Sequence, residues 1–410
     1  MKISLIQPGR NNLKYLKWSY NSIRKNQGNH EVEICVADDF SNDGTWDWCQ
    51  EMIDKDPLFK AIRNEGPTRL GHTILYDRLV NEVATKDICM IYHADMYLCP
   101  GAIDAIEKYI EPKTIVSLTR IEPPLHPEGP EKILKDFGIE PEEFNEDGLL
   151  DFLYRNEKLL GRVTEGIFAP WAFYKKDFQE IGGHDPLYAP QSKEDSDIFN
   201  RFQLNGVNFI QTWQGCVYHM TCRGSRFADG AKRNPDGKVF MKNRETDEWL
   251  KQNEKATKEF IRKWGHFVKH DEHLKPIIPP KYNIGFILNG NNFNLLNVLE
   301  PWCSTIYADP YMIQDYIQAE QPNTSFNLHD RVKPLDNEKN NEIIVEINGN
   351  NFTQQDFAYI QNFAEIIAND DNLKDELLHF SDDPEFELGN LKVTISSLKT
   401  YEKELININK

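Results

Sequence analysis

The sequence has 410 residues and a formal net charge of −18, and hydrophobic residues make up 40% of it. This length allows more than one domain, and the hydrophobic share is sufficient for a folded core rather than a disordered chain. The negative charge disfavours nucleic acid and anionic membrane surfaces as partners, because the protein would repel both.

Cysteine usage and the N-terminal residues indicate the compartment. The seven cysteines are scattered and none forms a Cys-x-x-Cys pair, so they predict free thiols in a reducing environment rather than a disulfide framework. The first apolar stretch is too short for a signal peptide, and no run of about 18 apolar residues occurs. We therefore expect a cytoplasmic protein without a membrane span.

Strand and helix signals alternate through the first hundred residues. Short apolar runs at 2–7, 31–39 and 87–96 predict strands, while 44–53 and 72–84 predict helices. This alternation favours an α/β fold with a mostly parallel sheet, in which ligands bind beyond the carboxyl ends of the strands.

Polar residues follow three of these predicted strands. They are Arg10 with its neighbours, the Asp38-Asp39 pair, and His93 with Asp95. Because parallel strands end at the same edge of a sheet, these groups are expected to form one composite site. For His93 and Asp95 the residues alone leave two interpretations open. They are either a polar strand end that caps the next helix, or ligands of a metal ion.

The remaining sequence predicts a continuation of this domain, a linker and a second domain. Residues 112–160 are proline-rich at their centre and predict a looser insert that ends in a short helix. The stretch 276–283 contains three prolines and predicts a linker. We expect residues 1–275 to form a Rossmann-like α/β domain and residues 284–410 to form a small, acidic α+β domain of unknown role.

Four motifs occur in an order that is known from one enzyme family. Residues 36–47 read VADDFSNDGTWD, residues 93–104 read HADMYLCPGAID, residues 182–188 read GGHDPLY, and residues 193–206 read KEDSDIFNRFQLNG. Together they resemble the family 2 glycosyltransferases over residues 1–270. The resemblance implies the GT-A fold and transfer of a sugar from a nucleotide diphosphate donor to an acceptor hydroxyl, with inversion and usually with Mn²⁺ or Mg²⁺.

The resemblance implies a metal site at Asp95 and His219. The family's second motif ends in an Asp that contacts the metal ion, and this Asp matches Asp95. His93 stands where the family has another Asp, a departure that puts a contact with the donor ribose in doubt. His219 matches a position where some relatives offer a histidine to the same ion; the alternative is a strand-end histidine bonded to the backbone. A cation there would neutralise the diphosphate leaving group.

Further residues match the family's donor-binding positions. Asp39 matches an Asp that accepts a hydrogen bond from the base, and a carboxylate that accepts from uracil N3–H favours a UDP donor. Arg69 lies where relatives place a basic residue near the nucleotide, and Arg10 lies in the first strand–helix turn. Arg223 follows His219 in a loop that could close over the diphosphate. The alternative for these arginines is a solvated loop or helix start.

Asp195 matches the family's catalytic base. An acceptor hydroxyl must lose its proton as it attacks the anomeric carbon, and one positioned carboxylate can take that proton. Glu194 and Trp171 match positions that shape the acceptor pocket, where an aromatic ring can stack on a sugar. The alternatives are helix-start charge for the two acids and core packing for the tryptophan.

Two other functions stay open at this stage. A GT-A-like chain can lose activity and serve as a binding or scaffold protein, and His93 is the motif departure that favours this. A sugar-phosphate nucleotidylyltransferase is less favoured, because residues 6–12 lack the glycine-rich, basic stretch that grips a triphosphate. Residues 284–410 carry no known motif; they are expected to support homo-oligomer formation or docking of a glycan acceptor.

Overall fold

The computed structural model describes residues 1–156, 161–221, 230–243, 245–370, 373 and 384–408. Its chain forms two compact units. The first contains Met1–Gln252, His270–Pro276 and the C-terminal residues from Asn407, and the second contains Asn253–Lys269 and Ile277–Ile406. Helix α9 (Asp247–Trp264) is divided between the two units. The expected domain borders at residues 275 and 284 stay a prediction.

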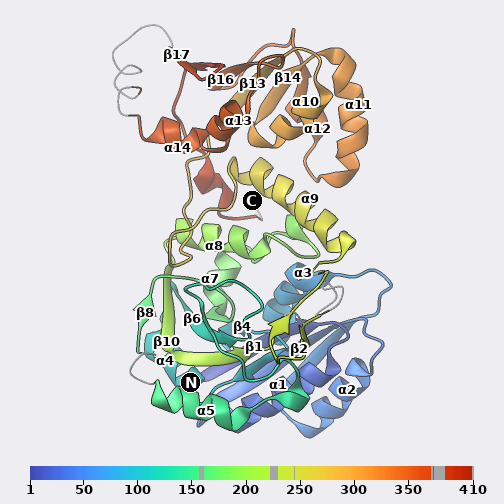
Figure 1. Cartoon of the computed structure of the whole chain (residues 1–410), viewed down its shortest axis with the longest axis vertical. Helices are drawn as coiled ribbons and strands as arrows, with labels where there is room; N and C mark the ends of the chain where they lie inside the picture. The colour runs from blue at the N-terminus through green and yellow to red at the C-terminus, as the bar shows by residue number, and fades with distance from the viewer. Residues whose placement is uncertain (157–160, 222–229, 244, 371–372, 374–383, 409–410) are drawn as a thin grey trace. The chain divides into compact units, whose positions relative to one another are not determined.

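A ten-stranded mixed sheet forms the centre of the first unit (Figure 1). Its order is β3-β2-β1-β4-β9-β6-β10-β5, with β7 beside β6 and β8 beside β10. The strands are β1 (Lys2–Gly9), β2 (Glu31–Asp39), β3 (Phe59–Asn64), β4 (Ile88–Ile91), β5 (Met96–Leu98), β6 (Thr114–Glu122), β7 (Lys132–Leu134), β8 (Val163–Thr164), β9 (Trp171–Tyr174) and β10 (Asn208–His219). Strands β1 to β4 are parallel, and their order reverses between β1 and β4. This reversal is where α/β sheets form ligand crevices.

Helices cover both faces of this sheet. Figure 1 shows α1 and α2 along one face and α3 on the other. The helices are α1 (Leu13–Asn26), α2 (Thr45–Lys55), α3 (Gly71–Arg78), α4 (Ala102–Tyr109), α5 (Glu146–Arg155), α7 (Lys175–Glu180) and α8 (Glu194–Leu204), and a short hairpin pairs β11 (Lys232–Arg233) with β12 (Val239–Phe240). The predicted strands at 2–7 and 31–39 and the predicted helices are confirmed, and α3 continues into a π-helical turn at Leu79–Val83. The strand predicted at 87–96 is shorter, because β4 ends at Ile91 and Met96 begins β5.

The buried Glu33 connects β1, β2 and β3 in the first unit. It lies on β2, is 1% exposed, and accepts hydrogen bonds from Ser4 Oγ on β1 at 2.5 Å and from Thr85 N at 2.8 Å. Lys60 Nζ on β3 lies 2.9 Å from its carboxylate. Burial raises the pKa of Glu33, but these donors outweigh burial and lower the pKa to about 2.

The expected loose insert at 112–160 is wrong in its first part. Residues Thr114–Glu122 form β6, which is buried along its whole length and pairs with β9 and β10 inside the sheet. Its sequence, TIVSLTRIE, places Thr, Ser, Arg and Glu in a buried strand, so an apolar run does not stand out. The helix expected at the end of this segment is confirmed as α5.

The second unit is built on a six-stranded sheet of order β15-β14-β13-β16-β18-β17. Its strands are β13 (Ile284–Asn289), β14 (Thr305–Ala308), β15 (Val332–Pro334), β16 (Ile343–Asn348), β17 (Glu385–Leu388) and β18 (Leu391–Ile395). Its helices are α10 (Phe293–Leu299), α11 (Pro310–Glu320), α12 (Leu328–Arg331), α13 (Gln354–Gln361) and α14 (Phe363–Ala368). The strands from β13 to β16 are parallel and separated by helices, whereas β18 and β17 are antiparallel. The expected α+β description is therefore not confirmed.

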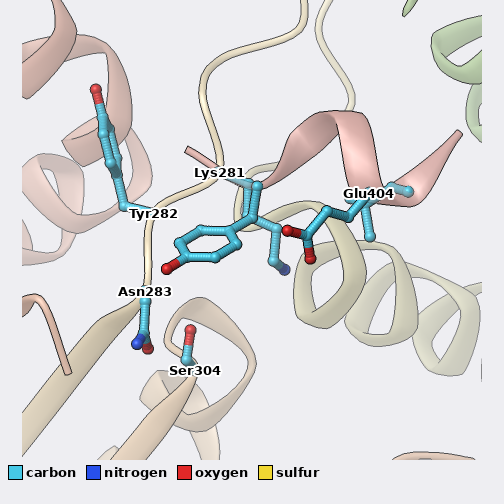
Figure 2. Close-up of a pocket in the computed structure, with 7 residues that line it drawn as sticks. Lys281, Tyr282, Asn283, Ser304 and Glu404 are labelled. Atoms are coloured by element: carbon cyan, nitrogen blue, oxygen red, sulfur yellow. The ribbon is translucent and has the colours of Figure 1, made fainter. Parts of the chain in front are cut away.

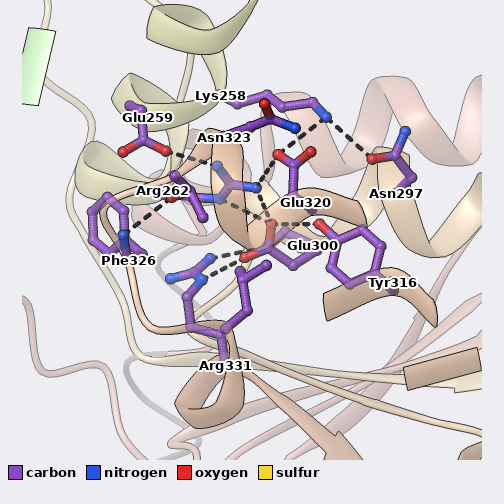
Figure 3. A network of polar contacts seen from close by, with 12 residues as sticks. Lys258, Glu259, Arg262, Asn297, Glu300, Tyr316, Glu320, Asn323, Phe326 and Arg331 are labelled. Carbon is purple, nitrogen blue, oxygen red and sulfur yellow. Dashed lines mark hydrogen bonds and ion pairs between the residues drawn. The ribbon is translucent and has the colours of Figure 1, made fainter. Parts of the chain in front are cut away.

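A buried ionic network crosses the second unit (Figure 3). Arg262 is 2% exposed, and its guanidinium donates to Glu300 at 2.7 and 2.9 Å, to Glu259 at 2.7 Å and to Glu320 at 2.7 Å. Glu300 also accepts from Tyr316 Oη at 2.9 Å. These contacts connect α9 to the helices that follow β13 and β14, so Arg262 neutralises acids from three elements.

A pocket of about 290 Å³ lies elsewhere in the second unit (Figure 2). It is lined by Lys281, Tyr282, Asn283, Ser304, Tyr401, Glu404 and Leu405. The Lys281 ammonium donates to the backbone oxygens of Arg262 at 3.0 Å and of Lys263. Both acceptors belong to the last turn of α9, so Lys281 serves as a cap for that helix end.

Within the described residues, no helix combines the length and the apolar character that crossing a membrane requires.

Candidate active site

Three possible metal ligands converge at the carboxyl edge of the first unit's sheet. His93 and Asp95 lie between β4 and β5, and His219 is the last residue of β10. Strand β10 pairs with β5, and Met220 N donates to Asp95 O at 3.1 Å, which brings His219 beside Asp95. One ligand atom from each of the three side chains lies within 4.8 Å of the other two.

This donor set fits a divalent cation. It offers one carboxylate oxygen and two imidazole nitrogens, a combination that Mn²⁺ accepts, whereas Mg²⁺ prefers oxygen alone. Asp95 Oδ1 and His219 Nε2 are 3.3 Å apart. His93 matches a donor-binding position of the family in the sequence, and the structure groups its side chain with the possible metal ligands.

Glu122 accepts a hydrogen bond from His219 and fixes the orientation of its ring. Glu122 Oε1 lies 2.7 Å from His219 Nδ1, so Nδ1 carries a proton and Nε2 faces Asp95. Burial raises the pKa of Glu122, but Arg120 and His219 outweigh burial and lower the pKa to about 2. Burial disfavours a charged His219, but Asp95 and Glu122 raise its pKa to about 9. With this pKa the ring carries a proton on both nitrogens at neutral pH, so a cation would displace the proton on Nε2, while Glu122 fixes the orientation of the ring.

His93 differs from its neighbour in charge. Removal from water, with the adjacent His219 as a further cause, lowers the pKa of His93 to about 3. The two rings lie 5.6 Å apart between centroids. His93 is therefore neutral at physiological pH and keeps a lone pair for a ligand.

Arg10 and Arg69 bring positive charge to the same edge of the sheet. The guanidinium of Arg10 lies 4.2 Å above the ring centre of Phe40, and its buried Nε has no hydrogen-bond partner among the described residues. Burial lowers the pKa of Arg69, Asp39 opposes this, and the nearby charge of Arg10 lowers it further. Two like charges held near each other are suited to an anion such as a diphosphate.

Asp39 organises the loop that carries Arg69. The Asp39 carboxylate accepts from Asn64 Nδ2 at 2.6 Å, from Leu70 N at 3.1 Å and from Gly71 N at 3.0 Å, and Arg69 Nε lies 3.7 Å away. A carboxylate has about four acceptor positions, so these donors leave capacity for one more. The expected contact with the nucleotide base stays a prediction. Its neighbour Asp38 accepts from the turn amide of Ser41 at 3.1 Å, which gives Asp38 a structural role.

Glu194 and Asp195 begin helix α8 with their carboxylates removed from water. Glu194 is 9% exposed, and its Oε2 has no hydrogen-bond partner among the described residues. Burial and the charge of Asp195 raise the pKa of Glu194. Burial also raises the pKa of Asp195, while His184 and Arg120 oppose the increase. A carboxylate with a raised pKa is a stronger base, which suits removal of a proton from a hydroxyl.

The backbone before α8 is strained. Ser192 and Lys193 have φ values of +86° and +71°, which non-glycine residues adopt at a cost of about 1–2 kcal/mol each. Lys193 is the N-cap residue of α8 and its side chain makes no capping bond. Strain of this kind, held by surrounding structure, is a feature of functional sites.

Asp197 has a structural role. It is fully buried and lies 2.7 Å from Arg201 Nε, and the same guanidinium donates to the carbonyl oxygens of Ile181 at 3.0 Å and Gly183 at 2.7 Å. This network ties α8 to the turn before it. It separates Asp197 chemically from Glu194 and Asp195, although all three stand in one helical turn.

Two predicted ligand contacts have different outcomes. Trp171 is fully buried on β9, with Phe173 at 4.7 Å, Phe199 at 5.6 Å and Phe202 at 5.9 Å between ring centroids. Its ring faces are covered, so the structure places Trp171 in the core and the expected sugar contact is corrected. Arg223 lies outside the described residues.

His184 and Asp77 are additional residues near Asp195 that the sequence analysis did not identify. His184 Nδ1 lies 2.7 Å from Asp77 Oδ1, and His184 N donates to both Asp77 oxygens at 3.0 and 3.2 Å. The His184 ring stacks on Tyr76 at 5.5 Å, and its buried Nε2 has no partner among the described residues. His184 belongs to the GGHDPLY motif at residues 182–188. Asp77 could not be predicted from the sequence, because an Asp in an amphipathic helix is expected to be exposed to solvent.

Residues 4–181 match the family model described as Glycosyl transferase family 2. The match covers less than half of the chain. It includes Asp39, His93 and Asp95 and ends before Glu194 and His219. Residues 4–181 of the first unit are therefore similar to family 2 glycosyltransferases.

One relative shares part of this sequence. A stretch of 122 residues is 30% identical to the abequosyltransferase RfbV of Salmonella typhimurium strain LT2, and it covers 29% of this chain and 35% of that protein. The match thus spans about a third of the relative's length.

Several solved structures are similar to part of the chain. GalNAc-T7, solved with UDP, GalNAc and Mn²⁺, has 17% identity and a TM-score of 0.41, covering 53% of this chain and 43% of that chain. The mannosyltransferase PcManGT of Pyrobaculum calidifontis, solved with GDP-Man and Mn²⁺, has 16% identity and a TM-score of 0.38, covering 53% of this chain and 56% of that chain. The chain spans about half the length of these proteins.

Proposed function

We propose that the first unit transfers a sugar from a nucleoside diphosphate donor to a hydroxyl group of a carbohydrate acceptor, with inversion at the anomeric carbon. The observation that carries this proposal is the convergence of His93, Asp95 and His219 at the carboxyl edge of the sheet. It is supported by the similarity of residues 4–181 to family 2 glycosyltransferases, because this stretch contains the first two of these residues.

His93, Asp95 and His219 would hold a divalent cation, with Glu122 orienting His219. When bound, such a cation neutralises the charge that develops on a diphosphate leaving group. The two imidazoles favour Mn²⁺ over Mg²⁺. Arg10 and Arg69 add charge-assisted donors for the phosphate oxygens, because the charge of Arg10 acts on Arg69 and the two guanidinium groups share this edge of the sheet.

Asp195 acts as the general base. It accepts the proton of the acceptor hydroxyl while the oxygen attacks the anomeric carbon and the bond to the diphosphate breaks. Glu194 is buried beside it, and its contact is with the acceptor. A single direct displacement places the new bond opposite the old one, so the product has the inverted configuration.

The proposed donor nucleotide is uridine diphosphate. Asp39 keeps one acceptor position after its three donors, and uracil N3–H can fill it, whereas cytosine has no hydrogen at that nitrogen. Guanine presents an N1–H and is the main competitor. Isothermal titration of UDP, GDP and CDP in the presence of Mn²⁺ should give the tightest binding for UDP; a preference for GDP or CDP would refute this assignment.

A thermal-stability screen of nucleotide sugars, with Mn²⁺ or with EDTA, tests the proposal as a whole. A ligand at 100 times its Kd stabilises the folded state by about 2.7 kcal/mol. We expect a metal-dependent increase in Tm for UDP-sugars. If no nucleotide sugar shifts the Tm under either condition, the donor site does not exist.

A further inference from the structure

The pentapeptide Asn-Gly-Asn-Asn-Phe occurs twice in the second unit, at residues 289–293 and 348–352. Each copy begins at the last residue of a parallel strand, Asn289 in β13 and Asn348 in β16. These two strands are neighbours, and their register places Asn289 opposite Asn348. The two copies therefore leave the same edge of the sheet side by side.

This edge is the topological switch point of the second sheet. In the order β15-β14-β13-β16, the chain moves from β13 outward to β14 and β15, and β16 then returns to the other side of β13. Open α/β sheets bind ligands at the carboxyl ends of the strands where this reversal occurs. The first unit has the same reversal between β1 and β4, and Arg10 and His93 follow those two strands.

The two loops contact each other. Gly349 N donates to Asn289 O at 2.8 Å. Gly290 has a φ of +102°, and a Cβ atom there would lie 3.7 Å from the Asn350 amide. Glycine at 290 therefore gives the first loop a conformation that other residues rarely adopt, and the second loop packs against it. The contacts hold the two asparagine-rich segments as one surface.

The exposed side chains of this surface are amides. Asn289, Asn291, Asn350 and Asn351 are exposed, and their side-chain amides form no hydrogen bond within the described part of the chain. Each amide offers two donors and an acceptor. These amides can therefore both donate hydrogen bonds to sugar hydroxyl groups and accept hydrogen bonds from them.

Exposed aromatic rings lie at the same edge. Phe293 ends the first copy of the motif and is 40% exposed, and Tyr311, which is 86% exposed, follows the end of β14, the neighbour of β13. Rings with one open face provide apolar contact area for a ligand with an apolar side, such as a pyranose. Neither copy of the motif contains a charged residue, and Asp309 beside Tyr311 is acidic, so a phosphate-bearing ligand is disfavoured.

We propose that the two Asn-Gly-Asn-Asn-Phe loops, with Tyr311, form a binding site for an uncharged carbohydrate chain. The asparagine amides bond the hydroxyl groups, and Phe293 and Tyr311 contact the sugar faces. The inference goes beyond the proposed function, because it concerns the second unit and does not depend on donor binding or on chemistry in the first.

Binding of the full chain to a printed array of neutral and acidic oligosaccharides tests this site, because dense display makes weak carbohydrate binding measurable. The test variants are the double variant Asn291→Ala/Asn350→Ala and the single variant Tyr311→Ala. Asn340→Ala is the matched control, since Asn340 is exposed and precedes β16, at the opposite edge of the sheet. Binding of UDP with Mn²⁺ is measured on every variant.

We expect the wild-type chain and Asn340→Ala to bind neutral oligosaccharides equally. Both test variants should bind about tenfold more weakly, because hydrogen bonds or ring contacts are lost, while UDP binding stays unchanged. The proposal is overturned if the wild-type chain binds no neutral oligosaccharide, if both test variants bind like the control, or if Asp95→Ala abolishes oligosaccharide binding. If neither the wild-type chain nor any variant binds UDP, but oligosaccharide binding changes as expected, the result contradicts the proposed function of the first unit and leaves the oligosaccharide site supported.

Discussion

At the scale of single residues, three acids in one helical turn have different tasks. Asp197 is neutralised by Arg201 in the interior, whereas burial raises the pKa of both Glu194 and Asp195, and the charge of Asp195 raises that of Glu194 further. Sequence position alone cannot separate these acids, since all belong to the first turn of α8. Their surroundings decide which one can accept a proton.

Asp195→Asn should reduce turnover by about 10²–10⁴, because the amide cannot accept the proton of the acceptor. Donor affinity should stay near its wild-type value, since Asp195 faces the acceptor in the proposed site. Steady-state kinetics and titration of UDP check the two parts. The acidic limb of the wild-type pH–rate profile should lie above the ordinary aspartate value of about 4, because burial raises the pKa of Asp195.

Asp197→Asn is the matched control for Asp195. It should lower the free energy of unfolding by about 3–5 kcal/mol, because it leaves the buried Arg201 unpaired. Urea unfolding measures this difference. Near wild-type turnover in Asp195→Asn, or an unchanged stability in Asp197→Asn, would reverse the roles given to these two acids.

Asp95→Ala should abolish the Mn²⁺ dependence of UDP binding, because it removes the carboxylate from the ligand group. His93→Ala should weaken the binding less, since Asp95 and His219 stay in place. Glu122→Gln should weaken metal binding by about 10–100-fold through loss of the fixed orientation of His219. Titration of Mn²⁺ in the presence of UDP checks all three. Unchanged metal affinity in Asp95→Ala would exclude this ligand group.

Residue types at strand ends allowed part of this site to be predicted. His93, Asp95 and His219 were identified before the structure, and the structure brings them together. Glu122 and His184 were not assigned a role, because their task depends on partners that are distant in the sequence. Burial explains the misplaced Trp171, since an aromatic residue of a sheet strand is equally compatible with a core and with a pocket.

At the scale of secondary-structure elements, Glu33 links β1, β2 and the segment before β4. Glu33→Gln should lower the free energy of unfolding by roughly 2 kcal/mol at neutral pH, because hydrogen bonds to a charged acceptor are lost. The folded pKa of about 2 lies below the ordinary value of 4.5, so this stability is complete above pH 4.5 and is lost as the pH falls towards 2.

Urea unfolding of wild-type protein and Glu33→Gln between about pH 7 and pH 3 measures this dependence. The difference between the two proteins should be constant from neutral pH to about 4.5 and should then decrease. A difference that is independent of pH would mean that the charge of Glu33 is not what holds the strands.

Arg262 has the corresponding role in the second unit. Arg262→Ala should destabilise that unit by about 3–5 kcal/mol, because it removes the guanidinium paired with the buried Glu259 and leaves the buried Glu300 paired with Arg331. Arg155→Ala is the control, since Arg155 pairs with Asp151 on the exposed side of α5, and no measurable change is expected. Equal unfolding midpoints in denaturant for both variants would contradict the structural role of the network.

Element predictions succeeded where hydrophobic periodicity was strong and failed where polar residues are buried. Strand β2 has four consecutive apolar residues at 34–37, whereas β6 buries Arg120 and Glu122, whose charges are paired inside the protein. The second unit was misjudged for a different reason. Its short strands β14 and β15 give little local signal, and only their parallel pairing shows that strands and helices alternate there.

At the scale of the whole molecule, both units use the same strand order around a switch point. In the first unit this edge carries arginine, histidine and aspartate, and in the second it carries asparagine, phenylalanine and tyrosine. The chemical difference follows the proposed ligands, a charged nucleotide sugar and an uncharged carbohydrate. The duplicated loops are visible in the sequence, but their adjacency depends on the register of β13 and β16, which the sequence does not reveal.

The most direct test of the central claim is an NMR time course of UDP-sugars incubated with the full chain and Mn²⁺. The account predicts that at least one UDP-sugar releases UDP, that the freed or transferred sugar first appears with the inverted anomeric configuration, and that EDTA stops the reaction. A sugar released with retained configuration, or a complete panel of UDP-sugars that stays intact and unbound in the presence of Mn²⁺, would contradict it.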